Sequence, residues 1–222
     1  MIMLMKNIDQ QFDFDKNRIN RLVIENPVEW RGFLLRLQRQ ISNSEEFIMI
    51  FENLKEQSFA KCVDVIYSPM NLSSNQTRLL NKLYKALAED CSKGEKVLET
   101  LESKSNIVSF VSNLIFDKEI SLTLNDDFDL TGLFKLVGVK FEDTDNDIMS
   151  NLLDYMIATR ELEGDKIFIF IGLSDFLSTY DKDVFYESII SKEFKILLID
   201  RNIYEKHRYE NVVVIDEDLC EI

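Results

Sequence analysis

The sequence predicts a mixed α/β protein in which the two ends of the chain build one head and a helical segment is inserted between them. Apolar runs typical of strands occur towards both ends, as in Phe47-Ile-Met-Ile-Phe51 and Ile167–Ile171, whereas the middle of the chain shows helical periodicity. We therefore expect residues 1–58 to form the first part of the head, residues 59–142 a helical leg, and residues 143–222 the second part of the head.

The first part of the head has the pattern strand, helix, strand. Residues 22–25 are typical of a short strand, and Asn26-Pro27-Val28-Glu29 predicts a helix start, because Asn is a favoured N-cap and Pro suits the first helical position. The run at residues 47–51 is continuously apolar, which indicates a strand buried on both faces. The helix places its apolar residues on one face: Trp30, Phe33, Leu34, Leu37 and Ile41.

The middle of the chain predicts two long helices joined by the link Cys91-Ser-Lys-Gly94, and a short link of this kind favours an antiparallel pair. Caps for the first helix are available at residues 73–75. Residues 120–124 alternate in polarity, as in an edge strand or an extended segment. Asp129 is expected to cap a short helix that ends at Gly138.

The last part of the chain returns to α/β organisation. Asp145 or Asn146 is expected to open a helix that runs through Ile157. The predicted elements that follow are a strand at 167–171, a helix at 181–191, and strands at 196–199 and 212–215.

The composition is that of a globular protein, with 45% apolar and 30% charged residues. No apolar run reaches the roughly 18 residues that a membrane span needs, and three scattered cysteines do not suggest a disulfide framework. We therefore expect a cytoplasmic protein. The net charge of −14 disfavours nucleic-acid binding over the whole surface, although binding depends on local fields.

Known catalytic and nucleotide-binding motifs are missing from the sequence. None of the glycines belongs to a G-x-x-x-x-G-K-[ST] or G-x-G-x-x-G pattern, so we expect no nucleotide. His207 is the single histidine and lies in a charged segment typical of a solvated loop, and Gly172-Leu-Ser174 lacks the closing glycine of a nucleophile elbow. Zinc is excluded for want of ligands. We expect a protein that is not an enzyme.

Oxygen ligands for a hard cation such as Ca²⁺ are available in two acidic clusters. From Asp127 the first cluster follows D-x-D-x-T-G, the opening of an EF-hand loop, but Gly138 stands where that loop needs Glu. The second cluster either binds a cation or stabilises the start of the following helix. The first cluster contains Asp117, Glu119, Asn125, Asp126, Asp127 and Asp129, and the second contains Glu142, Asp143, Asp145 and Asp147.

Basic residues form small groups that are either solvated or able to contact phosphates. Lys135 and Lys140 flank Gly138, and Arg36 and Arg39 lie on the first predicted helix. We take these four residues as the candidates for phosphate contact, and they become the candidate DNA-binding residues if the family resemblance described below holds.

Several stretches together resemble the ring-forming, DNA-end-binding adaptation protein family of type II-A CRISPR loci. The order and spacing agree from about residue 60 to the end of the chain. The stretches are Cys62-Val-Asp-Val-Ile-Tyr67, Asn71-Leu-Ser-Ser-Asn-Gln-Thr-Arg-Leu-Leu80, the acidic residues 117–129, Leu133-Phe-Lys-Leu-Val-Gly-Val-Lys-Phe-Glu142, the strand at 167–171, and Lys195-Ile-Leu-Leu-Ile199 with Asp200-Arg201 after it.

The resemblance implies a degenerate ATPase-like α/β head with an inserted helical leg, structural Ca²⁺ and a homotetrameric ring. Such a ring threads the ends of linear double-stranded DNA and works beside the CRISPR integrase complex and the effector nuclease. It places Lys135 or Lys140 near DNA and implies four cation ligands: Glu119, Asp126, Asp127 and Asp129.

Three functional hypotheses follow. The first is a non-catalytic, sequence-independent DNA-end-binding ring that supports spacer acquisition. The second is a helical protein–protein adaptor with an inert α/β head. The third is a metal-dependent nuclease that uses Asp126, Asp127 and Asp129.

Overall fold

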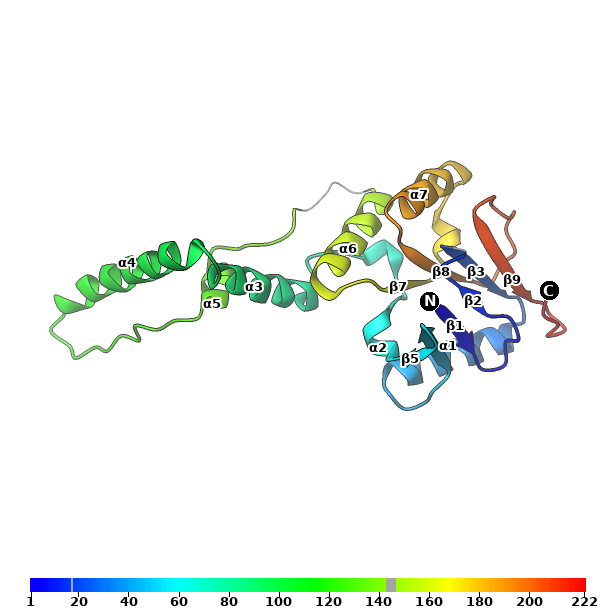
Figure 1. The fold of residues 1–222 in the computed structure, drawn as a ribbon, viewed down its shortest axis with the longest axis horizontal. Coiled ribbons are helices and arrows are strands. Elements are labelled where there is room, and N and C mark those ends of the chain that lie inside the picture. The colour runs from blue at the N-terminus through cyan, green and yellow to red at the C-terminus, as the bar shows by residue number, and fades with distance from the viewer. Residues whose placement is uncertain (17, 143–146) are drawn as a thin grey trace. The chain divides into compact units, whose positions relative to one another are not determined.

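The computed structural model describes residues 1–16, 18–142 and 147–222. The chain divides into two compact units, which we call the head unit and the leg unit. Figure 1 shows the elements of both. The head unit comprises Met1–Ser73, Asp145–Arg160 and Gly164–Ile222, and the leg unit comprises Ser74–Thr144 and Glu161–Glu163.

The centre of the head unit is a parallel sheet with the strand order β6-β7-β8-β3-β9. In β7 the isoleucines of Ile167-Phe-Ile-Phe-Ile171 point to one face and the phenylalanines to the other, and every residue is buried. The mixed α/β fold predicted from the sequence is therefore confirmed. The strands are β3 (Ile19–Ile24), β6 (Val63–Ile66), β7 (Ile167–Ile171), β8 (Lys195–Asp200) and β9 (Glu210–Ile215).

One face of the parallel sheet packs against helix α1 (Pro27–Ile41) and a small antiparallel sheet. Phe33 and Leu37 of α1 share one apolar core with the isoleucines of β7 and with residues of the small sheet. Asn26 caps α1 as predicted, its side chain accepting hydrogen bonds from the backbone of Val28 and Glu29. The small sheet has the order β2-β1-β4-β5, with β1 (Ile2–Met5), β2 (Phe12–Asp13), β4 (Ile48–Glu52) and β5 (Lys55–Gln57).

The prediction that residues 47–51 form a strand buried on both faces was wrong in its second part. Strand β4 exists, but it is antiparallel to β1, and its residues alternate between buried and partly exposed. The reason is that an antiparallel sheet packs one face on the core and leaves the other accessible to solvent.

The opposite face of the parallel sheet is covered by α6 (Ile148–Glu163) and α7 (Thr179–Ser191). Phe168 meets Tyr155 of α6 with ring centroids 6.5 Å apart, and Phe170 meets Phe185 of α7 at 6.3 Å, both in edge-to-face geometry. Helix α7 begins in a capping box formed by Ser178 and Asp181, two residues earlier than expected.

The boundary expected between head and leg at residue 59 lies too early. Val63–Ile66 forms β6, which pairs in parallel with β7 at the edge of the head sheet. Pairing with a strand from the far end of the chain is not a local signal, so the sequence pattern alone placed this segment with the leg. The short helices α2 (Phe59–Cys62) and η1 (Pro69–Asn71) flank β6, and the leg unit begins at Ser74.

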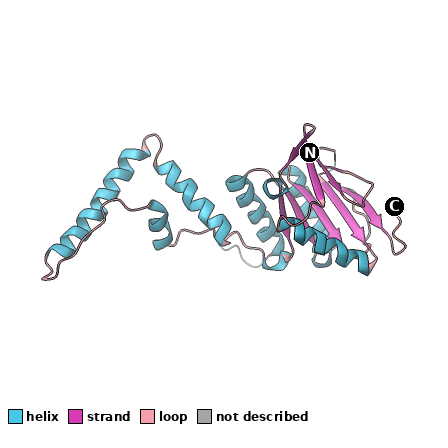
Figure 2. Ribbon diagram, turned by 90° about the horizontal axis from the view of Figure 1, so that it is seen from below, coloured by secondary structure: helices cyan, strands magenta, loops and turns pink. Residues whose placement is uncertain are grey.

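The leg unit contains α3 (Thr77–Cys91), α4 (Lys96–Phe116) and α5 (Leu130–Leu136). The expected antiparallel pair is not formed: α4 leads away from α3, as Figures 1 and 2 show, and has no buried residue. Instead α5 packs against α3, and the Tyr84 hydroxyl of α3 donates a hydrogen bond of 2.8 Å to the Val139 carbonyl. The expected caps at residues 73–75 are not used, because Gln76 is the N-cap residue of α3.

Two local predictions for the segments after α4 are confirmed. Asp129 caps α5 by accepting a hydrogen bond from the Thr131 backbone, and Gly138 follows the helix with a φ of 74° that favours glycine. Residues 120–124 form neither a helix nor a strand in the part of the chain that the structure describes. Helix α6 has Asp147 as its N-cap, whereas the openings expected at Asp145 or Asn146 lie outside the described residues.

Candidate functional site

The acidic residues expected to bind Ca²⁺ lie in the leg unit, in the segment between α4 and α5. Asp127 forms an ion pair of 3.2 Å with Lys104 of α4, whose ammonium also lies 5.2 Å from the Phe128 ring centroid. Asp129 accepts hydrogen bonds from both the hydroxyl and the backbone of Thr131, and these bonds lower the pKa of its carboxyl group. Glu119 and Asp126 are exposed.

Within residues 1–16, 18–142 and 147–222, no group of three or more His, Cys, Asp or Glu side chains is arranged to hold a metal ion. The four expected ligands are therefore close in sequence but are not gathered around one point in the structure. Of the second acidic cluster, Asp147 caps α6, whereas Asp143 and Asp145 lie outside the described residues.

The four candidate DNA-binding residues are divided between the two units. Lys135 is exposed on α5, with its ammonium 5.8 Å from the Tyr84 ring centroid, and Lys140 is exposed in the segment after Gly138. Arg36 and Arg39 belong to the head unit. Arg36 pairs with Glu29 and lies 4.8 Å from the centroid of the Phe47 ring, so this guanidinium is held by its own helix and the adjoining loop. Arg39 pairs with Glu45 at 3.5 Å.

A buried polar cluster lies between the parallel sheet and α7, and no sequence motif predicts it. Arg21 of β3 and Glu210 of β9 form an ion pair of 3.3 Å with side chains no more than 1% exposed. The Tyr186 hydroxyl donates a hydrogen bond of 2.6 Å to the other oxygen of Glu210. Arg21 donates in turn to the backbone carbonyl of Tyr204, at 2.9 Å. The signal in the sequence was that a charged residue stands in each of two mostly apolar strands. Arg21 lies near the centre of β3, and Glu210 is the first residue of β9.

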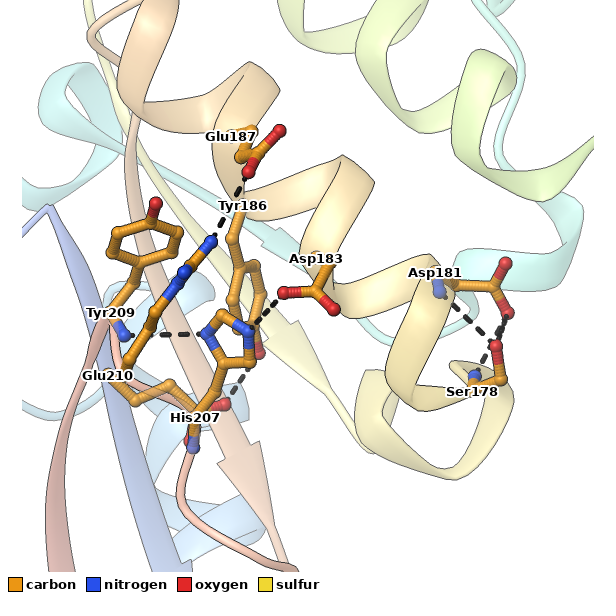
Figure 3. A network of polar contacts seen from close by, with 9 residues as sticks. Ser178, Asp181, Asp183, Tyr186, Glu187, His207, Tyr209 and Glu210 are labelled. Atoms are coloured by element: carbon orange, nitrogen blue, oxygen red, sulfur yellow. Dashed lines mark hydrogen bonds and ion pairs between the residues drawn. The ribbon is translucent and has the colours of Figure 1, made fainter.

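His207 belongs to this cluster, so the prediction of a solvated histidine was wrong (Figure 3). Its Nδ1 accepts a hydrogen bond from the Tyr209 backbone at 3.4 Å, and its Nε2 lies 2.9 Å from an Asp183 oxygen. A neutral imidazole whose Nδ1 accepts must carry its proton on Nε2, so His207 donates to Asp183. Its ring also packs edge-on against Tyr186, with centroids 5.0 Å apart.

Asp200, the last residue of β8, lies in the same interior at 2% exposure. Ser174 donates a hydrogen bond of 2.6 Å to one carboxyl oxygen, and the other oxygen has no hydrogen-bond partner. Burial raises the pKa of Asp200, while the Ser174 hydrogen bond and the charges of Arg21 and Lys182 lower it in part. Asp200 is thus a buried carboxyl group whose ionised form is incompletely compensated.

A cavity of about 640 Å³ adjoins this cluster on the α7 side of the head unit. Its walls come from η2 (Leu173–Phe176), from the first turns of α7, and from residues 204–208. Lys182 of α7 lines it and is 8% exposed, with its ammonium 4.9 Å from the Tyr204 ring centroid. A cation–π contact of this kind stabilises the ammonium by about 0.5–2 kcal/mol.

The fold is that of a mixed α/β protein with a parallel-sheet head unit, which contains the polar cluster, and a separate helical unit. The sequence profile of the CRISPR-associated protein family Cas_Csn2 matches residues 40–219. The chain belongs to this family, which confirms the resemblance found in the sequence.

The fold is similar to that of a solved structure. The crystal structure of Stu0660 of Streptococcus thermophilus matches 97% of this chain and 75% of its own chain at 14% identity, with a TM-score of 0.53. A bacterial Atm1-family ABC exporter with ATP bound matches 97% of this chain but 37% of its own, at 11% identity and a TM-score of 0.39, which is too low to support an argument. No curated protein matches the sequence.

No helix in the described ranges is both long enough and apolar enough to cross a membrane.

Proposed function

We propose that this protein is a non-catalytic ring that binds the ends of double-stranded DNA without sequence preference and supports spacer acquisition in type II-A CRISPR immunity. The observation that carries the proposal is the family match over residues 40–219. Its partners would be linear duplex DNA, further copies of the same chain, the CRISPR integrase complex and the effector nuclease, and its setting would be the cytoplasm.

The leg unit supports self-assembly. Helix α4 has no buried residue although it is rich in apolar side chains, and an exposed apolar helix is stabilised by packing against another protein surface. The exposed apolar side chains of α4 are Leu98, Leu101, Ile107, Phe110, Leu114 and Phe116. A homotetramer would cover this helix and would also multiply the few lysines that each chain offers to phosphates.

Structural Ca²⁺ belongs to the same proposal, with Glu119, Asp126, Asp127 and Asp129 as the candidate ligands. The described residues do not form a closed cation site, so binding would draw these side chains together and relieve their mutual repulsion. The lack of a phosphate-binding loop in the sequence supports a role that does not involve nucleotide hydrolysis.

Linear and covalently closed DNA of the same sequence provide the test. A closed ring must be entered from an end, so a gel-shift titration with Ca²⁺ should show binding of linear duplex and little binding of the sealed circle, and the DNA should be recovered intact. Equal affinity for both forms would refute end threading. Cleavage with Mg²⁺ or Mn²⁺ would support the nuclease hypothesis. Absence of binding to either form of DNA would support the adaptor hypothesis, in which the exposed α4 contacts another protein.

A further inference from the structure

The cavity beside α7 is placed where parallel sheets bind ligands. Strands β7 and β8 run in parallel, so the segments that follow Ile171 and Asp200 leave the sheet at the same edge. The second segment then crosses to the start of β9, which lies at the opposite edge, because Glu210 is opposite Ile19 at the start of β3. The cavity is open to solvent on one side and lies between this crossing segment, η2 and α7, all within the head unit.

Lys182 lines this cavity with a positive charge that has no direct ion-pair partner in the described residues. In the part of the chain that the structure describes, its ammonium forms no ion pair and no hydrogen bond, although the residue is 8% exposed. Its contact with the Tyr204 ring and its longer-range interaction with the Asp200 carboxyl are the favourable interactions that the structure gives this ammonium. An ammonium that faces a cavity and has no direct ion pair can take an anion as a partner, and the cavity that Lys182 lines has room for one.

Asp200 interacts with the Lys182 charge but lies behind the cavity lining and forms no direct ion pair with it, and the carboxylates of the wall itself are engaged elsewhere or exposed. Asp175 accepts a hydrogen bond from the Tyr204 hydroxyl, and Asp183 is held by His207 (Figure 3). Glu205 is exposed. Lys206 and Arg208 add positive charge at the exposed rim, where Arg208 pairs with Glu187 at 3.3 Å.

We propose that this cavity binds a small phosphate monoester whose phosphate group pairs with the buried Lys182 ammonium. Lysine recognises phosphate as a compact point charge, and the first turn of α7 adds backbone partial charge of the same sign. The capping box of Ser178 and Asp181 already satisfies part of that helix end, so the lysine carries the recognition. The cavity volume of about 640 Å³ is that of a small-molecule site. This ligand site goes beyond the proposed function and does not depend on DNA binding.

The single histidine of the chain gives a specific probe, because His207 lines the cavity and produces one set of imidazole proton signals. Inorganic phosphate and ribose 5-phosphate would be titrated into the full-length protein at constant ionic strength, with acetate as the control anion. We expect saturable shifts of the His207 imidazole signals and a rise in melting temperature with both phosphates, and neither effect with acetate.

Lys182→Gln keeps the length of the side chain and removes its charge, and Lys192→Gln is the matched control on the exposed end of α7. We expect Lys182→Gln to weaken phosphate binding by about tenfold or more, since loss of a charge-assisted contact has that effect, and Lys192→Gln to leave it unchanged. Lys182→Met serves as a second variant that removes the charge and keeps an unbranched apolar side chain, and circular dichroism checks that both variants are folded.

The outcomes are distinct. Equal responses of the parent protein and both Lys182 variants, or equal responses to phosphate and acetate, would overturn the proposal. Binding of 5′-phosphorylated duplex, but not of ribose 5-phosphate, with shifts at His207 would also overturn it in favour of a DNA terminus as the occupant. A phosphate response at His207 in a protein that binds no DNA would support the site while refuting the proposed function.

Discussion

The Arg21 guanidinium and the Glu210 carboxylate form an ion pair of 3.3 Å in the interior of the head unit. The two residues come from opposite ends of the chain and meet because β3 and β9 are neighbouring parallel strands. Tyr186 donates to Glu210, and Arg21 donates to the Tyr204 carbonyl, so the pair joins the sheet to α7 and to the crossing segment. The pair is therefore expected to matter for folding more than an exposed ion pair would.

Removing one partner of this pair should be strongly destabilising. Glu210→Ala leaves the Arg21 charge buried without a counterion, and we expect a loss of about 3–5 kcal/mol in the free energy of unfolding. The double variant Arg21→Met with Glu210→Met should recover much of that loss, because no uncompensated charge remains. Urea denaturation of the three proteins measures both effects. A double variant as unstable as the single one would show that the charges are not coupled.

The stability of the head should depend on the ionisation of Asp200. Its pKa in the folded protein is raised above the ordinary value of 3.8, chiefly by burial, so the folded state binds the proton more tightly than the unfolded state. The resulting penalty is absent at pH values below 3.8 and grows as the pH rises through the folded pKa. Asp200→Asn removes the penalty, so its melting temperature should exceed that of the parent protein by a margin that increases as the pH rises above 3.8 and levels off above the folded pKa.

Asp165→Asn, at an exposed position before β7, is the control for Asp200→Asn and should show no such trend. A difference between Asp200→Asn and the parent protein that stays constant with pH, or that falls as the pH rises, would contradict the role given to burial.

The exposed side chains of α4 should determine the oligomeric state. Phe110→Glu together with Leu114→Glu places two charges on an apolar surface, and we expect the assembly to dissociate towards a chain of 26.1 kDa. Multi-angle light scattering at micromolar concentration with Ca²⁺ measures the mass, which for a tetramer is roughly four times larger. Asn106→Glu, on the polar stripe of the helix that also carries Glu102 and Asn113, should leave the mass unchanged. A monomeric parent protein would refute the ring.

Lys135 and Lys140 should contribute to DNA affinity through phosphates alone. The double Ala variant should weaken binding of every linear duplex alike and should flatten the plot of log affinity against log salt by roughly 0.9 for each phosphate that is no longer neutralised. Lys82→Ala with Lys85→Ala, on the exposed surface of α3, makes the same change in net charge and is the control. An identical salt slope in the two double variants would show that total charge, and not position, governs binding.

Calcium should stabilise the assembly through the acidic segment between α4 and α5. Changing Asp126, Asp127 and Asp129 to Asn removes the charges that attract the cation, while Asn at position 129 remains a good cap for α5. Adding a chelator should lower the melting temperature and the oligomer mass of the parent protein, and should leave both unchanged in the triple variant. Glu99→Gln with Glu102→Gln on α4 is the control. If the chelator has no effect on the parent protein, these acids are only a solvated surface.

Local chemistry predicted several elements from the sequence alone. Asn26 and Pro27 begin α1, Asp129 and Gly138 bracket α5, and the run Ile167–Ile171 is a buried strand, because a cap, a left-handed glycine and a short apolar run each act through their immediate neighbours. The mixed α/β fold followed from the order of such signals along the chain, whereas the family came from the resemblance of several stretches and from the profile match.

Only the tertiary structure determined which distant segments meet. Val63–Ile66 became the edge strand of the head sheet through pairing with β7, and β4 joined a separate antiparallel sheet with β1. His207, expected in solvent, and Lys182 were enclosed by segments that the sheet topology brings together. The physical reason is that strand pairing and burial of charge depend on contacts between residues far apart in sequence, which no local pattern of side chains specifies.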